Sequence, residues 1–305
     1  SWDNPWDVLA MSNYNTISAI SESPVREGLI YAGTDDGFIN VTDNDGKRWK
    51  KFEVKRLPGA PEYAYVNDLK ADNFDENTVY AVLDNHKYGD YKPYVYKSTN
   101  KGQTWKSIVS NLPQKSHSWR IVQDHVKKDL LFLGTEFGVY FSVNGGEIWT
   151  KLTGNVPTIP FRDLAIHKRE NDLVGATFGR GFYIFDDMSV FRSISEDQMK
   201  SKATLFPVRK ALWYIPRSFL GGSGKASQGD GYYIAPNPPF GAVFTYHISE
   251  PYQTKAEKRR ERETKSSKTI GFPGWNEVEA ERREHKPKII FEIKDSDGNV
   301  VRRLE

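Results

Sequence analysis

Acidic side chains at predicted turns are the first candidates for chemistry in this 305-residue chain. Asp35 and Glu136 each follow a short apolar run of strand length, and Asp163 stands at the start of another. Two carboxylates roughly 5–9.5 Å apart across a cleft can hydrolyse a glycosidic bond. These three residues are therefore candidate catalytic residues. The alternative is that they shape their turns and face water.

Basic and aromatic side chains accompany these carboxylates. Three arginines could converge on an acidic sugar, as a sialidase-type site requires. Two tyrosines in the long turn after Asp84 could stack on a sugar or cover a partner. The candidate ligand-binding face comprises Asp35, Asp36, His86, Tyr88, Tyr91, Arg120, Glu136, Arg162 and Arg180. The alternative for that part of the face is that Arg162 and Asp163 are a structural pair between blades.

The sequence predicts neither a metal site nor a cofactor. The chain has no cysteine, which excludes thiolate nucleophiles, disulfides and thiolate metal ligands. Its six histidines have no ligand spacing among them. Residues 295–298, Asp-Ser-Asp-Gly, resemble the start of a calcium loop, but no glutamate follows in register.

Charge and hydropathy exclude two classes of partner. The chain has 43 Lys and Arg against 40 Asp and Glu, for a net charge of +3. Residues 252–288 alone hold eleven basic and seven acidic residues, so the excess is local. We expect no nucleic-acid partner from this balance. No run of 18 apolar residues exists, so no membrane-spanning helix is expected either.

Short apolar runs recur along the first 190 residues and must position the candidate side chains. Four of them have the same shape and begin 49, 52 and 42 residues apart: 30–34, 79–83, 131–135 and 173–177. A further run precedes each of them, and another follows after a turn. Three to four strands in every 40–50 residues are typical of β-propeller blades.

Three of the repeats end in a sharper motif, [ST]-x-N-x-G-x-x-W. The copies are 42–49, 98–105 and 142–149. An Asn side chain can bond nearby turn amides, Gly accepts positive φ, and Trp can start the outer strand and pack back over the turn. The motif thus predicts a hairpin at the blade edge, and we assign no catalysis to it. The fourth repeat lacks the motif, which indicates either the last blade or the strand that leaves the propeller.

The motif resembles the Asp-box of BNR-repeat proteins, in which Asp usually fills the position held here by Asn. Residues 21–24, 31–37, 84–87, 91–94, 176–181 and 186–187 resemble the large bacterial BNR-repeat proteins related to sortilin, which are often labelled glycosyl hydrolases. The resemblance covers about residues 10–195. It implies a long chain that is secreted, periplasmic or at the cell surface, with a many-bladed propeller followed by a C-terminal β-sandwich. It implies little about chemistry.

The predicted fold is all-β and has three parts. Residues 1–195 form about four blades of four-stranded antiparallel sheets, 196–236 a linker, and 237–305 part of an immunoglobulin-like β-sandwich. Within the last part, 241–248 is a predicted strand, and Asp-Gly at 297–298 predicts a hairpin. The charged insertion 253–287 is predicted to be a solvated helix or a disordered excursion, or else a contact surface for another domain.

We expect a fragment, because the chain opens at Ser1 without Met and stops at Glu305 soon after a strand-like run. Its expected partners are the remaining blades and sandwich strands, from the same or an associated polypeptide. The leading functional hypothesis is a binding or scaffolding module that holds a protein, peptide or glycan on the propeller face. The alternatives are a glycoside hydrolase and a purely structural role in completing the ring.

Overall fold

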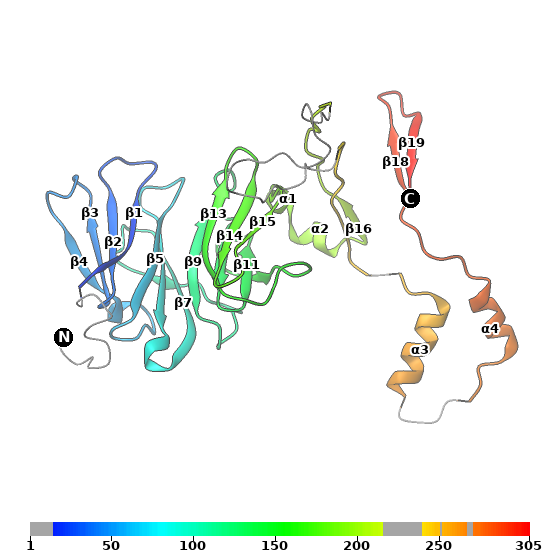
Figure 1. Ribbon diagram of the computed structural model, residues 1–305, viewed down its shortest axis with the longest axis horizontal. Coiled ribbons are helices and arrows are strands. Elements are labelled where there is room, and N and C mark those ends of the chain that lie inside the picture. Colours follow the sequence, from blue (N-terminus) through cyan, green and yellow to red (C-terminus); the bar gives the residue numbers. More distant parts are fainter. Residues whose placement is uncertain (1–14, 216–239, 251, 267–270) are drawn as a thin grey trace, which may run out of the picture. The chain divides into compact units, whose positions relative to one another are not determined.

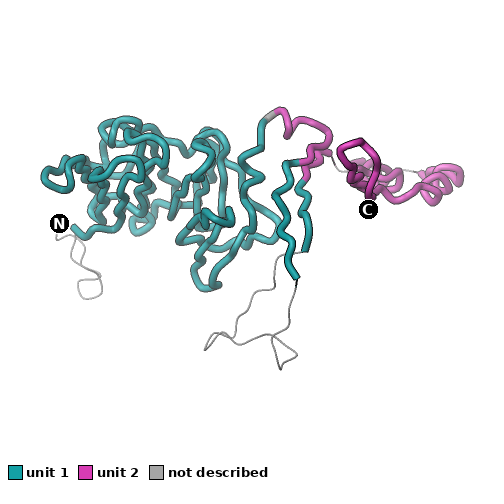
Figure 2. The backbone as a smooth tube through the Cα atoms, turned by 90° about the horizontal axis from the view of Figure 1, so that it is seen from above, with its two compact units in different colours: residues 1–195, 206–245 teal, residues 196–205, 246–305 magenta. Residues whose placement is uncertain are grey.

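The computed structural model describes residues 15–215, 240–250, 252–266 and 271–305. Figure 1 shows its helices and strands along the chain. The chain divides into two compact units. The first contains residues 1–195 and 206–245, and the second contains 196–205 and 246–305 (Figure 2). The predicted linker and sandwich segments at 216–239 lie outside the described residues.

The first unit is built from four consecutive antiparallel sheets, three with four strands and the last with three. Each sheet uses strands in sequence order, as the predicted blades require (Figure 1). The strands are β1 (Ile17–Glu22), β2 (Ile30–Thr34), β3 (Phe38–Thr42) and β4 (Lys50–Glu53); β5 (Tyr65–Ala71), β6 (Val79–Asn85), β7 (Asp90–Ser98) and β8 (Lys106–Ser107); β9 (Ser118–Gln123), β10 (Leu131–Thr135), β11 (Gly138–Ser142) and β12 (Thr150–Lys151); and β13 (Phe161–His167), β14 (Asp172–Thr177) and β15 (Phe182–Phe185). This confirms the propeller prediction.

Three hydrophobic cores lie between successive sheets, and the central strands are apolar because they contribute to two of them. Side chains alternate between the faces of a strand. In β6, Val79, Ala81 and Leu83 pack in the core between the first and second sheets. Tyr80 and Val82 pack in the core between the second and third. A third core joins the third and fourth sheets.

Neighbouring sheets approach so closely that some positions admit only glycine. A Cβ atom on Gly134, in β10, would lie 2.6 Å from the backbone oxygen of Phe161 in the next sheet. A Cβ on Gly33, in β2, would lie 2.3 Å from Cγ1 of Val66. The Gly-Thr ending of two of the repeated runs is thus explained by contact between blades.

The [ST]-x-N-x-G-x-x-W turns have the same hydrogen bonds in all three copies. The Ser or Thr hydroxyl accepts the glycine amide at 2.9–3.0 Å, and the Asn Oδ1 accepts the amide four residues later at 2.8–3.0 Å. Each glycine has positive φ, from 78° to 92°. Each Trp comes directly before the outer strand β4, β8 or β12. The predicted hairpins are therefore confirmed for Asn44, Asn100 and Asn144.

Residues after the fourth sheet also belong to the first unit. Helix α1 (Val190–Ser193) buries Phe191 in the third core. Arg209 donates to both the backbone and the carboxylate of Glu170, at 2.9 and 2.8 Å. These bonds hold Arg209, in the predicted linker, against the turn between β13 and β14 of the fourth sheet.

The second unit contains small elements. Helix α2 (Glu196–Lys200) precedes β16 (Ala203–Leu205), which pairs with β17 (Tyr246–Ile248). The strand expected at 241–248 is thus only three residues long. The hairpin of β18 (Phe291–Lys294) and β19 (Val300–Leu304) is confirmed. In the described residues the two ladders remain separate two-stranded sheets, so the sandwich stays a prediction.

The charged insertion folds as two helices, α3 (Lys255–Lys265) and α4 (Trp275–Arg282). A capping box of Thr254 and Glu257 begins α3. Arg259 joins the helices through two bonds to Glu281, at 2.7 and 3.0 Å. The helical interpretation of this segment is therefore correct. Over the described ranges, no helix is long and apolar enough to cross a membrane.

Candidate functional site

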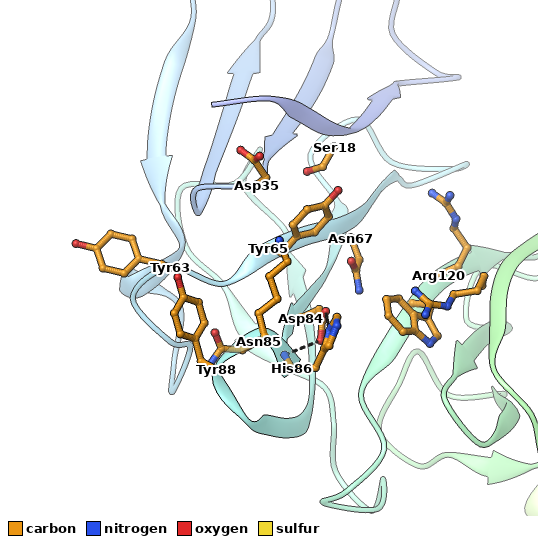
Figure 3. A pocket seen from close by; sticks show the side chains of 13 residues that line it. Ser18, Asp35, Tyr63, Tyr65, Asn67, Asp84, Asn85, His86, Tyr88 and Arg120 are labelled. Carbon is orange, nitrogen blue, oxygen red and sulfur yellow. Dashed lines mark hydrogen bonds and ion pairs between the residues drawn. The ribbon is translucent and has the colours of Figure 1, made fainter. Parts of the chain in front are cut away.

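A cavity of about 300 Å³ lies on the face of the first unit where turns from the successive sheets meet (Figure 3). Tyr63 and Tyr88 lie at one end and Arg120 at the other, with Asp35 above and Asp84 below the central Tyr65 and Asn67 in this view. The lining residues are Ser18, Asp35, Tyr63, Tyr65, Asn67, Asp84, Asn85, His86, Lys87, Tyr88, Trp119, Arg120 and Arg162.

Four of the lining side chains are placed by a backbone irregularity that recurs in every sheet. The pairing of each inner strand with its neighbour shifts by one residue near its start. Such a β-bulge bends the strand and re-aims the extra side chain. The extra residues are Ser18, Asn67, Trp119 and Arg162, and all four line the cavity. The inner strands thus supply the cavity at structurally equivalent positions.

Asp35 lines the cavity and also anchors the backbone. Its Oδ1 accepts the amides of Asn15 and Thr16, both at 2.9 Å. Asp36 is bonded to the hydroxyl of Thr34 at 2.5 Å and is not among the lining residues. The two neighbouring carboxylates therefore have different surroundings, and both hold the turn after β2.

Arg120 joins three sheets at the cavity wall. Its Nη1 donates to Asp68 at 2.8 Å, and its Nε lies 2.8 Å from Oδ1 of Asp163. Asp68 is buried and also accepts the amide of Ile121 at 2.9 Å. Burial raises the pKa of Asp68 to about 6, against the opposing effect of the Arg120 charge. This arrangement ties the inner strands β5, β9 and β13 together.

Trp119 is covered on one ring face and bonded at its edge. The guanidinium carbon of Arg162 lies 3.4 Å from the ring centroid, a cation–π contact. The indole Nε1 donates to Glu136 at 3.1 Å. Arg162 and Asp163 therefore each contact the third sheet, which is the structural role between blades considered as the alternative for this pair.

Two histidines that are 31 positions apart in sequence stack beside the cavity. The rings of His86 and His117 have centroids 5.2 Å apart and an interplanar angle of 18°. Asp84 accepts the amide of His86 at 3.1 Å and is in close contact with its Nδ1. Burial lowers the pKa of His117 despite the nearby carboxylates of Asp84 and Glu136. Sequence spacing gives no signal of this cluster.

The structure brings most of the predicted face together. Asp35, His86, Tyr88, Arg120 and Arg162 line the cavity. Tyr91 and Glu136 do not line it but lie next to His117: the ring centroids of Tyr91 and His117 are 6.2 Å apart, and Oε2 of Glu136 is 3.3 Å from Nε2 of His117. Arg180 is exposed in the turn after β14 and lies outside the lining set, as does Asp163.

Other cavity residues were missed by the sequence reasoning. Tyr63, Tyr65 and Lys87 line the cavity, and so do the bulge residues Ser18 and Trp119. Aligning the repeats could have identified Ser18 and Trp119, because they hold the same position near the start of the inner strand as Arg162, which was among the predicted residues. Tyr63 carries no such signal, since it lies in the irregular connection before β5.

Comparison with known proteins gives a partial similarity. No family model matches the chain. A xyloglucanase, Xgh74A of Acetivibrio thermocellus, is 26% identical over 205 residues, which is 62% of this chain and 23% of that protein. The chain thus spans about a quarter of the length of the curated relatives that it matches.

Solved structures share the propeller fold at low identity. The GH74 enzyme of Niastella koreensis is 22% identical with a TM-score of 0.47, over 56% of this chain and 28% of that one. The GH74 xyloglucanase of Xanthomonas campestris is 17% identical with a TM-score of 0.44, over 58% and 29%. The protein YCF48, solved with a D1 peptide, is 16% identical with a TM-score of 0.43, over 56% and 51%.

Proposed function

We propose that this chain is part of a secreted BNR-repeat propeller related to sortilin, and that it binds a glycan on its turn face without hydrolysing it. The observation that carries the proposal is the composition of the one cavity described above. Tyr63, Tyr65 and Tyr88 line it together with the amides Asn67 and Asn85.

This composition matches the chemistry of a sugar. A pyranose ring has apolar C–H faces that pack on aromatic rings, and hydroxyl groups that bond amides and charged side chains. Tyr63 and Tyr88 expose about half of their surface, 52% and 57%, so their rings are accessible to a ligand. The 26% identity to a xyloglucanase supports a β-glucan such as xyloglucan as the ligand class.

The carboxylates of the cavity support binding in preference to catalysis. A hydrolase needs one carboxyl group to give a proton and another to attack or activate water. Asp35 is held by two backbone amides, and Asp84 by His86. The other two candidate catalytic residues do not line the cavity. Glu136 is bonded to Trp119, and Asp163 is paired with Arg120.

Tyr88→Ala is expected to weaken binding of a xyloglucan oligosaccharide at least tenfold, about 1.4 kcal/mol, because a stacking surface is lost. Isothermal titration calorimetry on the full chain measures the effect. Tyr91→Ala is the matched control: it lies three residues further along, near the start of β7, with a similar exposure, 52%, but outside the cavity. An equal loss in both variants, or no binding by the unaltered chain, would contradict the proposal.

Hydrolysis of the same glycan is the alternative function. It is favoured by the similarity to a xyloglucanase and by the position of Asp35 and Asp84 on different sides of the cavity (Figure 3). If the alternative holds, reducing ends will be released from xyloglucan, and Asp35→Asn and Asp84→Asn will each abolish the release. Asp36→Asn, next to the cavity but outside it, will retain activity.

We also propose that a further blade packs against β1. Ile20 is 68% exposed, whereas its equivalents Leu69, Ile121 and Leu164 are at most 4% exposed because the preceding sheet covers them. A single exposed apolar residue is ordinary on a protein surface. Ile20 differs because the equivalent residues of the other three sheets are all in the core, which indicates that a partner covers this position. The remaining sandwich strands are proposed to come from the same or an associated polypeptide.

Ile20→Lys is expected to change the free energy of unfolding of this chain by less than about 0.5 kcal/mol. The equivalent Leu69→Lys will prevent folding, because it buries an unpaired charge. In a longer polypeptide that carries the preceding blade, Ile20→Lys will become strongly destabilising in chemical denaturation. Unchanged stability of that longer polypeptide would rule the contact out.

A further inference from the structure

At the wall of the cavity, the blades bring three potential metal ligands together. Asp84, His86 and His117 each offer one ligand atom, and these atoms lie within 4.8 Å of one another. Asp84 is the last residue but one of β6 in the second sheet, and His86 begins the following 3-10 turn (His86–Tyr88), whereas His117 directly precedes β9 of the third sheet. The cluster thus joins two blades.

The cluster contains a buried nitrogen that makes no hydrogen bond. His117 is 5% exposed, and its Nε2 is without a hydrogen-bond partner among the described residues. Oε2 of Glu136 lies 3.3 Å away, outside hydrogen-bonding geometry. A buried polar group without a partner is destabilising by about 1–3 kcal/mol, and such groups in native proteins call for a bound ion or water.

The ligand side chains are held in place by their neighbours. Oδ1 of Asp84 accepts the backbone amide of His86, which leaves Oδ2 directed at the imidazole. The ring of His117 packs edge-on against Trp119, at a centroid distance of 4.6 Å, and stacks on His86. Trp119 in turn donates to Glu136. Pre-positioned ligands of this kind lose little entropy when an ion binds.

We propose that Asp84, His86 and His117 bind one divalent first-row transition-metal ion, with Zn²⁺ as the best fit. Two imidazole nitrogens and one carboxylate oxygen are a donor set that suits Zn²⁺, whereas Mg²⁺ and Ca²⁺ prefer oxygen ligands alone. Glu136 is next to His117 but is not part of the cluster of three and accepts from Trp119, so water would complete the coordination. The chain has no cysteine, so no thiolate competes for the ion. The site does not depend on glycan binding.

The test uses the full chain, stripped with EDTA and titrated with ZnCl₂ alone. One equivalent is expected to bind, and His86→Ala and Asp84→Asn are each expected to weaken the affinity at least about 100-fold. The same variants will remove the d–d absorption of bound Co²⁺, which reports imidazole and carboxylate ligation independently of stability. MgCl₂ and CaCl₂ are expected not to compete for the site.

His125→Ala is the matched control for these variants. His125 also has a buried Nδ1 without a hydrogen bond and lies 3.4 Å from Asp124, but it is not part of the cluster of three. Zinc binding unchanged in His125→Ala and lost in the cluster variants would support the site. Absence of stoichiometric binding, or equal binding in wild type and His86→Ala, would overturn the proposal. His86 is used because its side chain is 40% exposed, so its removal leaves the core intact.

Discussion

Trp149→Ala is expected to lower the free energy of unfolding by about 3–5 kcal/mol. The indole is 2% exposed in the core between the second and third sheets. Its Nε1 donates to the carbonyl of Ile108 at 2.7 Å. The side-chain amide of Asn111 accepts from the backbone N–H of Trp149 and donates to its carbonyl oxygen, both at 2.8 Å. The substitution leaves a large cavity between two blades and an unpaired carbonyl. Chemical denaturation measures the loss.

Trp49→Ala is the matched control, because Trp49 holds the same position in the first copy of the turn motif. It is 43% exposed, since no preceding sheet covers it in the described part of the chain. We expect a loss of about 1 kcal/mol or less. Equal losses in the two variants would mean that the indole stabilises only its own hairpin and that the core position of Trp149 between two sheets adds nothing.

Arg120→Met is expected to destabilise the first unit by about 3–5 kcal/mol, because it leaves the carboxylate of Asp68 buried without its partner. The two residues are bonded at 2.8 Å, and Asp68 is 5% exposed. The double variant with Asp68→Asn should recover part of this loss, since no buried charge then remains. Arg169→Met removes an ion pair whose arginine is 82% exposed, and should change stability by less than about 1 kcal/mol.

Arg120→Met should also alter the titration of Asp68. Its pKa of about 6 in the folded chain exceeds the ordinary value of 3.8, so the folded state retains a proton that the unfolded chain releases. The contribution of Asp68 to stability therefore falls as pH rises from about 4 to about 6. Removal of the Arg120 charge should raise this pKa further and extend the loss above pH 6. Carboxyl-carbon NMR detects the shift, and an unchanged pKa would show that Arg120 is not the main opposing charge.

Local features of the fold were predictable. The turn motif uses hydrogen bonds that span four residues, from Asn44 to Arg48 for example, so the residues at those positions suffice to form it. The apolar runs were recognisable because a strand buried on both faces has no polar positions. The helical nature of 255–265 follows from its composition and from the capping box at Thr254. The predicted strand 241–248 is longer than the observed strand 246–248, because the ends of a strand depend on its pairing partner.

The composition of the site was only partly predictable. The turns carrying Asp35 and His86 were placed on the ligand face by the repeat alone, and both residues line the cavity. Tyr63 and Trp119 were missed, and Arg180 lies elsewhere on the surface. Which side chain of an inner strand faces the cavity depends on the bulge, and a shift of one residue moves a side chain to the other face.

The sequence by itself determined the repeated sheets and their edge hairpins, because these depend on contacts between residues close along the chain. The tertiary structure alone decided that His86 meets His117, that Arg120 meets both Asp68 and Asp163, and that one cavity collects residues from all four sheets. These contacts join residues 31 or more positions apart, and they form only when the sheets pack at a fixed distance. That distance is set by close approaches such as Gly134 against Phe161, which a linear pattern does not encode.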